Sequence, residues 1–151
     1  MPRVTERRSL VRAACAAWLA ATPAAVAAHT QDGSLGAAAA ATDYYQVTCS
    51  DDGAGAPASL VVQVDHRGPD GAPAVLVVAH RGASAATSAD VAGSTSPGPL
   101  VSVNSADGVY NVFLSKSGSG VANYSLTFHC MTGPNGAGLH TGTTIVFRQN
   151  Q

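Results

Sequence analysis

Apolar and polar residues alternate one by one over several short stretches of the chain, with turn residues between them. The clearest stretch lies in the C-terminal third, where Tyr124, Leu126, Phe128 and Cys130 alternate with mostly polar neighbours. A two-residue period is typical of a strand with one face in the core and one in solvent. On this pattern we expect strands over residues 44–49, 60–65, 110–115, 123–130 and 143–148, with a shorter one over 100–103.

Three further stretches lack this alternation. Residues 74–80 form a run without alternation, apolar up to His80, which suits a strand covered on both faces, so we expect this strand at the centre of a sheet. Residues 82–99 are rich in Ser, Ala, Thr, Gly and Pro and are expected to form an exposed loop. Residues 29–42 show no period and are expected to form a flexible N-terminal arm.

Seven short strands separated by turn residues predict an all-β fold, an antiparallel β-sandwich over residues 43–151. The composition agrees with this fold class, because every acidic residue after residue 28 is Asp, which favours turns and caps over helix interiors. A chain of about 120 residues is enough for one hydrophobic core and hardly for two. We therefore expect one domain with almost no helix.

Residues 1–28 have the layout of a cleaved signal peptide. A basic n-region is followed by an apolar stretch and by a cleavage region of small residues, which allows cleavage after Ala27 or after Ala28. The basic residues are Arg3, Arg7, Arg8 and Arg12. Because Arg7-Arg8 resembles the twin-arginine export pattern, both the Sec and the twin-arginine routes stay open. Either route predicts a secreted or periplasmic product that is not inserted in the membrane after cleavage.

Removal of residues 1–28 also changes the charge and the cysteine count. Four Lys or Arg and eight Asp remain, a formal net charge of −4 with His neutral, so the basic surface that nucleic acid requires is lacking. Cys49 and Cys130 are then the only cysteines. In an oxidising compartment an isolated pair of this kind predicts a disulfide.

Three short motifs place an aromatic residue near the start of an expected strand. They are Asp43-Tyr44-Tyr45-Gln46-Val47, Gly108-Val109-Tyr110-Asn111-Val112 and Gly120-Val121-Ala122-Asn123-Tyr124-Ser125-Leu126-Thr127. In these motifs residues 43–130 resemble the bacterial pre-peptidase C-terminal domain family. The resemblance implies a jelly-roll-like sandwich of a kind usually appended to secreted hydrolases, where it assists export, stability or polymer binding. The chain departs from the family in its two cysteines, in a further C-terminal strand and in lacking a catalytic domain, so we expect a stand-alone module.

Motifs for catalysis are missing, since the chain contains no G-x-S-x-G, C-x-x-C or H-E-x-x-H. We therefore expect no catalytic residues, no cofactor and no enzymatic activity, the alternative being a small hydrolase with an unrecognised site. The favoured prediction is a secreted, non-enzymatic module that binds an extracellular polymer or protein or has a structural role. Tyr44 and Tyr110 are the candidate contact residues, with Tyr110 expected in the core.

A second hypothesis, from another class, is a periplasmic protein that binds copper or calcium. His66, His80 and His129 are expected as solvated side chains, and the histidines lie too far apart in the sequence to share a site by local geometry. Cleavage after Ala28 would make His29 the N-terminal residue, whose amine and ring together could chelate Cu(II), although the arm offers it no partner histidine. His140 is the remaining histidine.

Calcium requires several oxygen ligands at once, which converging loops can supply. The aspartates that fall in turns or loops are Asp51, Asp52, Asp70, Asp90 and Asp107. Because no EF-hand spacing is present, we expect ordinary turn chemistry at these positions and assign no metal ligands.

Overall fold

The computed structural model describes residues 29–151, and in this part of the chain antiparallel strands make up nearly all of the regular structure. The strands are β1 (His29–Leu35), β2 (Asp43–Ser50), β3 (Ser59–His66), β4 (Val75–Arg81), β5 (Ser84–Asp90), β6 (Val101–Asn104), β7 (Gly108–Lys116), β8 (Ala122–Met131) and β9 (His140–Gln149). A single 3-10 turn, η1 (Pro134–Gly136), lies between β8 and β9. The predicted signal peptide lies outside the described residues.

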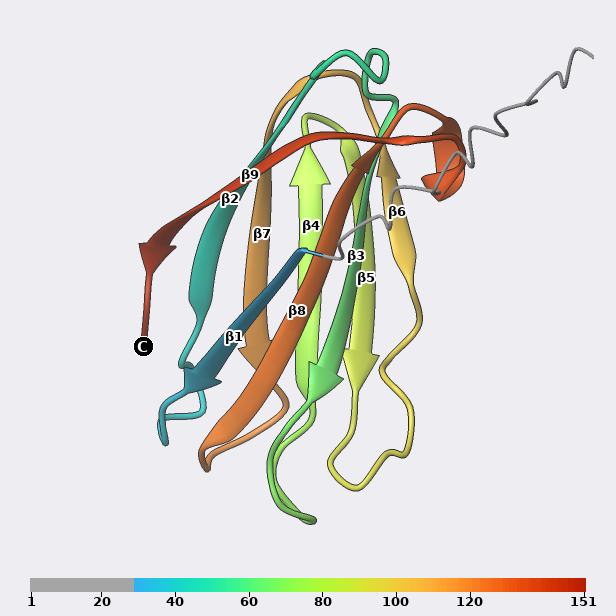
Figure 1. The fold of residues 1–151 in the computed structure, drawn as a ribbon. Helices are drawn as coiled ribbons and strands as arrows, with labels where there is room; N and C mark the ends of the chain where they lie inside the picture. The colour runs from blue at the N-terminus through green and yellow to red at the C-terminus, as the bar shows by residue number, and fades with distance from the viewer. Residues whose placement is uncertain (1–28) are drawn as a thin grey trace, which may run out of the picture.

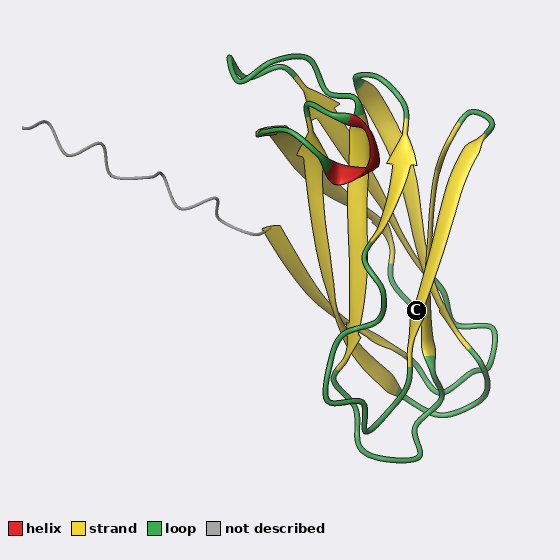
Figure 2. Ribbon diagram, turned by 90° about the vertical axis from the view of Figure 1, so that its right-hand side faces the viewer, coloured by secondary structure: helices red, strands yellow, loops and turns green. Residues whose placement is uncertain are grey.

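The strands form two layers that share one strand. One layer runs β5-β4-β7-β2-β9, and the other contains β1, β8, β3 and β6. β9 joins them, because it pairs with β2 along most of its length and with Cys130 and Met131 of β8 at its start. Figure 1 shows β1, β8 and β3 in front of β4 and β7, and Figure 2 shows the layers after a quarter turn. The predicted antiparallel all-β fold is confirmed.

The core lies between the two layers and is built from the alternating side chains of the strands. Its largest fully buried members include Tyr45, Tyr110, Tyr124, Leu35, Leu60, Leu114 and Leu126. Two of the tyrosines meet across the core, where the hydroxyls of Tyr45 and Tyr124 lie 2.7 Å apart. The Tyr124 hydroxyl in turn donates to Asp43, so the buried phenols are hydrogen-bonded, as buried polar groups must be.

The disulfide between Cys49 and Cys130 is confirmed, with the two Cα atoms 5.5 Å apart. It joins β2 in one layer to β8 in the other, and both cysteines are buried. Since it closes a loop with a sequence separation of 81, it restricts the unfolded chain over most of the domain.

The prediction of a flexible arm over residues 29–42 is wrong for its first half. Residues 29–35 form β1, which pairs with β8 from Ala122 to Phe128, and Leu35 at its end is fully buried. The strand escaped the sequence pattern because it contains one large apolar residue. Gly33 is part of the fit, since a Cβ there would lie 2.3 Å from the ring of Tyr124. The folded domain therefore includes residues 29–35, ahead of the expected start at residue 43.

The prediction of a loop over residues 82–99 is also partly wrong. Residues 84–90 form β5, an edge strand of small residues that pairs with β4 over its whole length. The prediction of a central strand covered on both faces holds only in that β4 is not an edge strand. It lies between β5 and β7, next to the edge of the layer, and Leu76 and Val78 on its outer face are only half-buried. With β1 and β5 added, the described chain has nine strands instead of the expected seven.

Substitution of Gly33 tests whether β1 belongs to the folded domain. Gly33→Ala places a methyl group against the buried ring of Tyr124, and we expect it to lower the free energy of unfolding by about 1–3 kcal/mol, as overpacking does. Gly118→Ala is the matched control, because a Cβ at Gly118 meets nothing within 4 Å. Urea unfolding followed by tyrosine fluorescence measures the free energy of unfolding of both variants. Equal values for the two would contradict the packing of β1 against Tyr124.

Candidate metal centre

Three of the five histidines meet at one end of β8. The ring centroids of His29 and His140 are 5.0 Å apart, those of His129 and His140 5.4 Å, and those of His29 and His129 6.2 Å. They come from β1, β8 and β9, strands that are far apart in the sequence. We refer to His29, His129 and His140 as the histidine cluster.

Strand pairing explains why the cluster forms. β1 pairs with β8 as far as Phe128, which faces His29, and β9 pairs with β8 from Cys130, which faces Thr141. His129 is the residue at which β8 exchanges one partner for the other. His29, the first residue of β1, is paired with Phe128, and His140, the first residue of β9, is paired with Met131, so both lie next to this point of β8.

The backbone on both sides of this exchange is anchored. Cys130, next to His129, is held by the disulfide, and its N–H donates to the hydroxyl of Thr143 at 3.0 Å. Thr141, next to His140, is fully buried, and its hydroxyl lies 2.9 Å from the carbonyl oxygen of Gly55. The positions of His129 and His140 are thus set by neighbours that cannot move freely.

The connection between β8 and β9 is also closed by hydrogen bonds. Thr132 N–H donates to Leu139 O at 2.9 Å, and Leu139 N–H donates back to the Thr132 hydroxyl at 2.8 Å. Within the turn, Gly133 N–H donates to Ala137 O at 2.9 Å. These bonds return the chain to β8 with His140 opposite Met131.

Two ring nitrogens of the cluster have no hydrogen-bond partner. His129 Nδ1 and His140 Nε2 are buried, and within residues 29–151 they are the buried side-chain polar atoms that lack a protein partner. Burial lowers the pKa of His29 and of His129, and the neighbouring His140 lowers both further. The neutral imidazole that results is the form that binds a metal ion.

The spacing of the rings fits a shared metal ion. With metal–nitrogen distances of about 2.0–2.1 Å, imidazoles on one ion have ring centroids about 4.5–6.5 Å apart, depending on the angle between them. All three measured distances lie in this interval. As the side chains stand, residues 29–151 contain no group of three His, Cys, Asp or Glu already arranged to hold a metal. Binding of one ion would therefore require the three rings to turn about their side-chain torsions, while the strand pairing keeps their backbones side by side.

The other two histidines behave differently. His66 was expected to be solvated, but it is buried, with Nδ1 accepting from Gly68 N–H at 3.0 Å and Nε2 3.1 Å from Pro73 O. His80 lies on β4 in the other layer, half-exposed and stacked on Phe113 with ring centroids 5.9 Å apart. Neither belongs to the cluster.

Asp51 lies in the connection between β2 and β3, as expected, whereas Asp90 was expected in a loop and is the last residue of β5. Asp51 accepts from the N–H of Gly53 at 2.8 Å, and buried Asp90 accepts from the N–H of His66 at 2.8 Å. Within the described chain no three of them come together with other ligands as a cation site.

Of the two candidate contact residues, Tyr110 lies in the core, as expected. It is fully buried and donates to Ser105 O at 2.6 Å. Tyr44 is half-buried, stacks on Phe113 at 4.6 Å and donates to Asn111.

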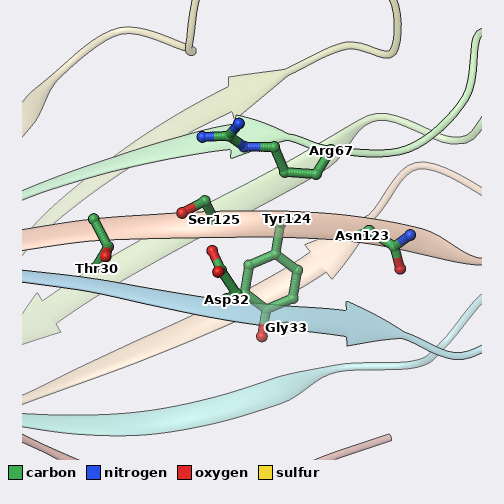
Figure 3. Close-up of a pocket in the computed structure, with 7 residues that line it drawn as sticks. All are labelled: Thr30, Asp32, Gly33, Arg67, Asn123, Tyr124 and Ser125. Carbon is green, nitrogen blue, oxygen red and sulfur yellow. The ribbon is translucent and has the colours of Figure 1, made fainter.

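The hollow in Figure 3 lies on the seam between β1 and β8, and none of the three histidines lines it. It has a volume of about 440 Å³, and its lining residues are Thr30, Asp32, Gly33, Arg67, Asn123, Tyr124 and Ser125. Arg67, the one cation among them, pairs with Asp65 at 2.7 Å. No lining residue is a histidine, a cysteine or a lysine, and the ionisable side chains of the lining are those of Asp32, Arg67 and Tyr124.

No helix of residues 29–151 has the length and apolar character that crossing a membrane would need. Comparison of the chain with protein-family models, with curated proteins and with solved structures finds no significant match. The resemblance to the pre-peptidase C-terminal domain family therefore stays a prediction.

Sequence reasoning missed the cluster because it judged the histidines by their separation along the chain. One available indication was the Gly-Pro-Asn-Gly turn between two expected strands, which brings residues before and after it together. The place of His29 in the cluster could not be predicted from the sequence, since no pattern in residues 29–35 indicates a strand.

Replacement of histidines by leucine in metal-free buffer distinguishes the cluster from structural histidines. His140→Leu removes a buried nitrogen that has no partner, so we expect the free energy of unfolding to stay equal or to rise by about 1 kcal/mol. His66→Leu leaves a backbone N–H and a carbonyl without their partner, and we expect a loss of about 1–3 kcal/mol.

Urea titration in the presence of EDTA measures both. A His140→Leu variant as unstable as His66→Leu would mean that His140 is a structural histidine.

Proposed function

We propose that the protein is an extracytoplasmic, non-enzymatic β-sandwich that binds one transition-metal ion through the imidazoles of His29, His129 and His140. The observation that carries this proposal is the presence of two buried, unpartnered ring nitrogens within a cluster of three histidines. A buried nitrogen without a partner costs about 1–3 kcal/mol, so its retention needs a reason. A bound metal supplies the missing partner for both nitrogens.

The ligand type favours copper or zinc over calcium. Imidazole nitrogen suits Zn, Cu and Ni, whereas Ca²⁺ takes six to eight oxygen ligands. Asp51 and Asp90 already accept hydrogen bonds from backbone N–H groups, and Asp52 accepts one from the hydroxyl of Thr141. The calcium alternative therefore has little support.

The disulfide and the predicted export segment both support the proposed compartment. Disulfides persist in the periplasm and outside the cell, where thiols are not kept reduced. The buried bond between Cys49 and Cys130 supports that location, and the signal peptide predicted over residues 1–28 provides the route.

We favour a binding role over a catalytic one, because binding needs only the three ligands and catalysis also needs a substrate site beside them. The hollow at the seam of β1 and β8 is lined by none of the three histidines. A carrier or buffer of metal needs the ligands alone, so the cluster is sufficient for it.

Metal titration of the purified protein tests the proposal. We expect one equivalent of Cu(II) or Zn(II) to bind and to raise the melting temperature, while Ca²⁺ changes nothing. His129→Ala and His140→Ala each remove one ligand and should weaken binding by about 100-fold or more, the upper end of the loss seen when supporting residues of a metal site are changed.

His80→Ala is the matched control, since His80 stacks on Phe113 in the other layer. Its affinity should equal that of the unaltered protein. Loss of binding in His80→Ala but not in His129→Ala, or no metal binding at all, would contradict the proposal.

A further inference from the structure

We infer that His29 is the first residue of the mature protein and that it binds Cu(II) through its own α-amine as well as its ring, so that signal cleavage completes the metal site. The inference rests on the proposed function, since it adds a fourth nitrogen to the same three histidines. It concerns which metal ion the site prefers and the step of export after which the site can bind that ion with all its ligands.

The position of His29 in the sequence makes the free amine available. Val26-Ala27-Ala28 places small residues where a signal peptidase requires them for a cut between Ala28 and His29. After that cut the α-amine belongs to a residue whose ring already lies in the cluster. The amine and ring Nδ1 of one histidine close a six-membered chelate ring with a metal.

The structure places this amine beside the other ligands. β1 begins at His29, whose Cα is paired with that of Phe128, the neighbour of His129. Its ring is 5.0 Å from that of His140, centroid to centroid. Because the α-nitrogen is one bond from a Cα that the β1–β8 pairing holds, it lies at the same end of β8 as the three rings.

The fourth nitrogen changes which metal fits. Three imidazoles alone leave one position open in the tetrahedral arrangement that zinc adopts. Three imidazoles and an amine make a set of four nitrogens, two of which are tied in one chelate, and tetragonal nitrogen sets are characteristic of Cu(II). The copper remains Cu(II), and the only other change is the loss of one proton from the α-ammonium group to solvent, from a pKa of about 8.

Two forms of the protein that differ only at the N-terminus test the inference. One form begins at His29, and the other begins at Ala25, which keeps all three imidazoles but moves the free amine four residues away. We expect the His29 form to bind Cu(II), titrated against a competing chelator, about 100-fold more tightly than the Ala25 form. For Zn(II) we expect less than a tenfold difference.

Copper electron paramagnetic resonance provides a second readout, with four equatorial nitrogens in the His29 form and a different spectrum in the Ala25 form. His80→Ala in the His29 form is the control and should reproduce the affinity and spectrum of the unaltered form. Melting temperatures in EDTA should agree between the forms, which excludes a folding defect.

The outcomes separate this inference from the proposed function. Equal Cu(II) affinities for the two forms, both weakened by His129→Ala, would overturn the amine ligand and leave the imidazole site intact. Failure of both forms to bind Cu(II) or Zn(II) would overturn both. N-terminal sequencing of the exported protein should begin His29-Thr30-Gln31, and a start at Ala28 would overturn the inference.

Discussion

One edge of β8 pairs with two strands, β1 and β9. The histidine cluster and the connection between the two layers both depend on the point where these strands meet. β1 occupies the edge from Ala122 to Phe128 and β9 occupies Cys130 and Met131, so His129 stands at the junction. The disulfide at Cys130 holds this point against the opposite layer. Because β9 also pairs with β2, the same junction connects the two layers of the sandwich. The pairing of β1 and β9 with β8 therefore supports both the fold and the histidine cluster.

The treatment of polar groups differs between the junction and the rest of the domain. Buried Lys116 donates to the carbonyl oxygens of Gly36 and Gly120, and the hydroxyls of Tyr45 and Tyr124 share a hydrogen-bonded chain with Asp43. These groups are satisfied, as is usual for buried polar atoms. At the junction two imidazole nitrogens are buried without a partner. Under the proposed function this cost is retained because the two unpartnered nitrogens bind a metal ion.

The parts of the fold that the sequence predicted are those built from large apolar side chains. The alternation around Tyr45 and around Phe128 identified β2 and β8, and the two cysteines on those apolar faces predicted the disulfide. β1 and β5 were missed because Gly, Ser and Ala carry little hydrophobic pattern, although pairing with a neighbour is enough to form an edge strand. The histidine cluster was missed because it arises from the register of β1 on β8, a long-range property that spacing along the chain does not contain.

The most direct measurement of the central claim is a long-range ¹H–¹⁵N NMR spectrum of the imidazole nitrogens before and after one equivalent of Zn(II). Zinc is diamagnetic, so each histidine stays visible, and the spectrum distinguishes free from metal-bound nitrogens. The account predicts that one nitrogen each of His29, His129 and His140 moves to a metal-bound shift while His66 and His80 keep theirs. Unchanged resonances for the three clustered histidines, or a response confined to His66 or His80, would contradict it.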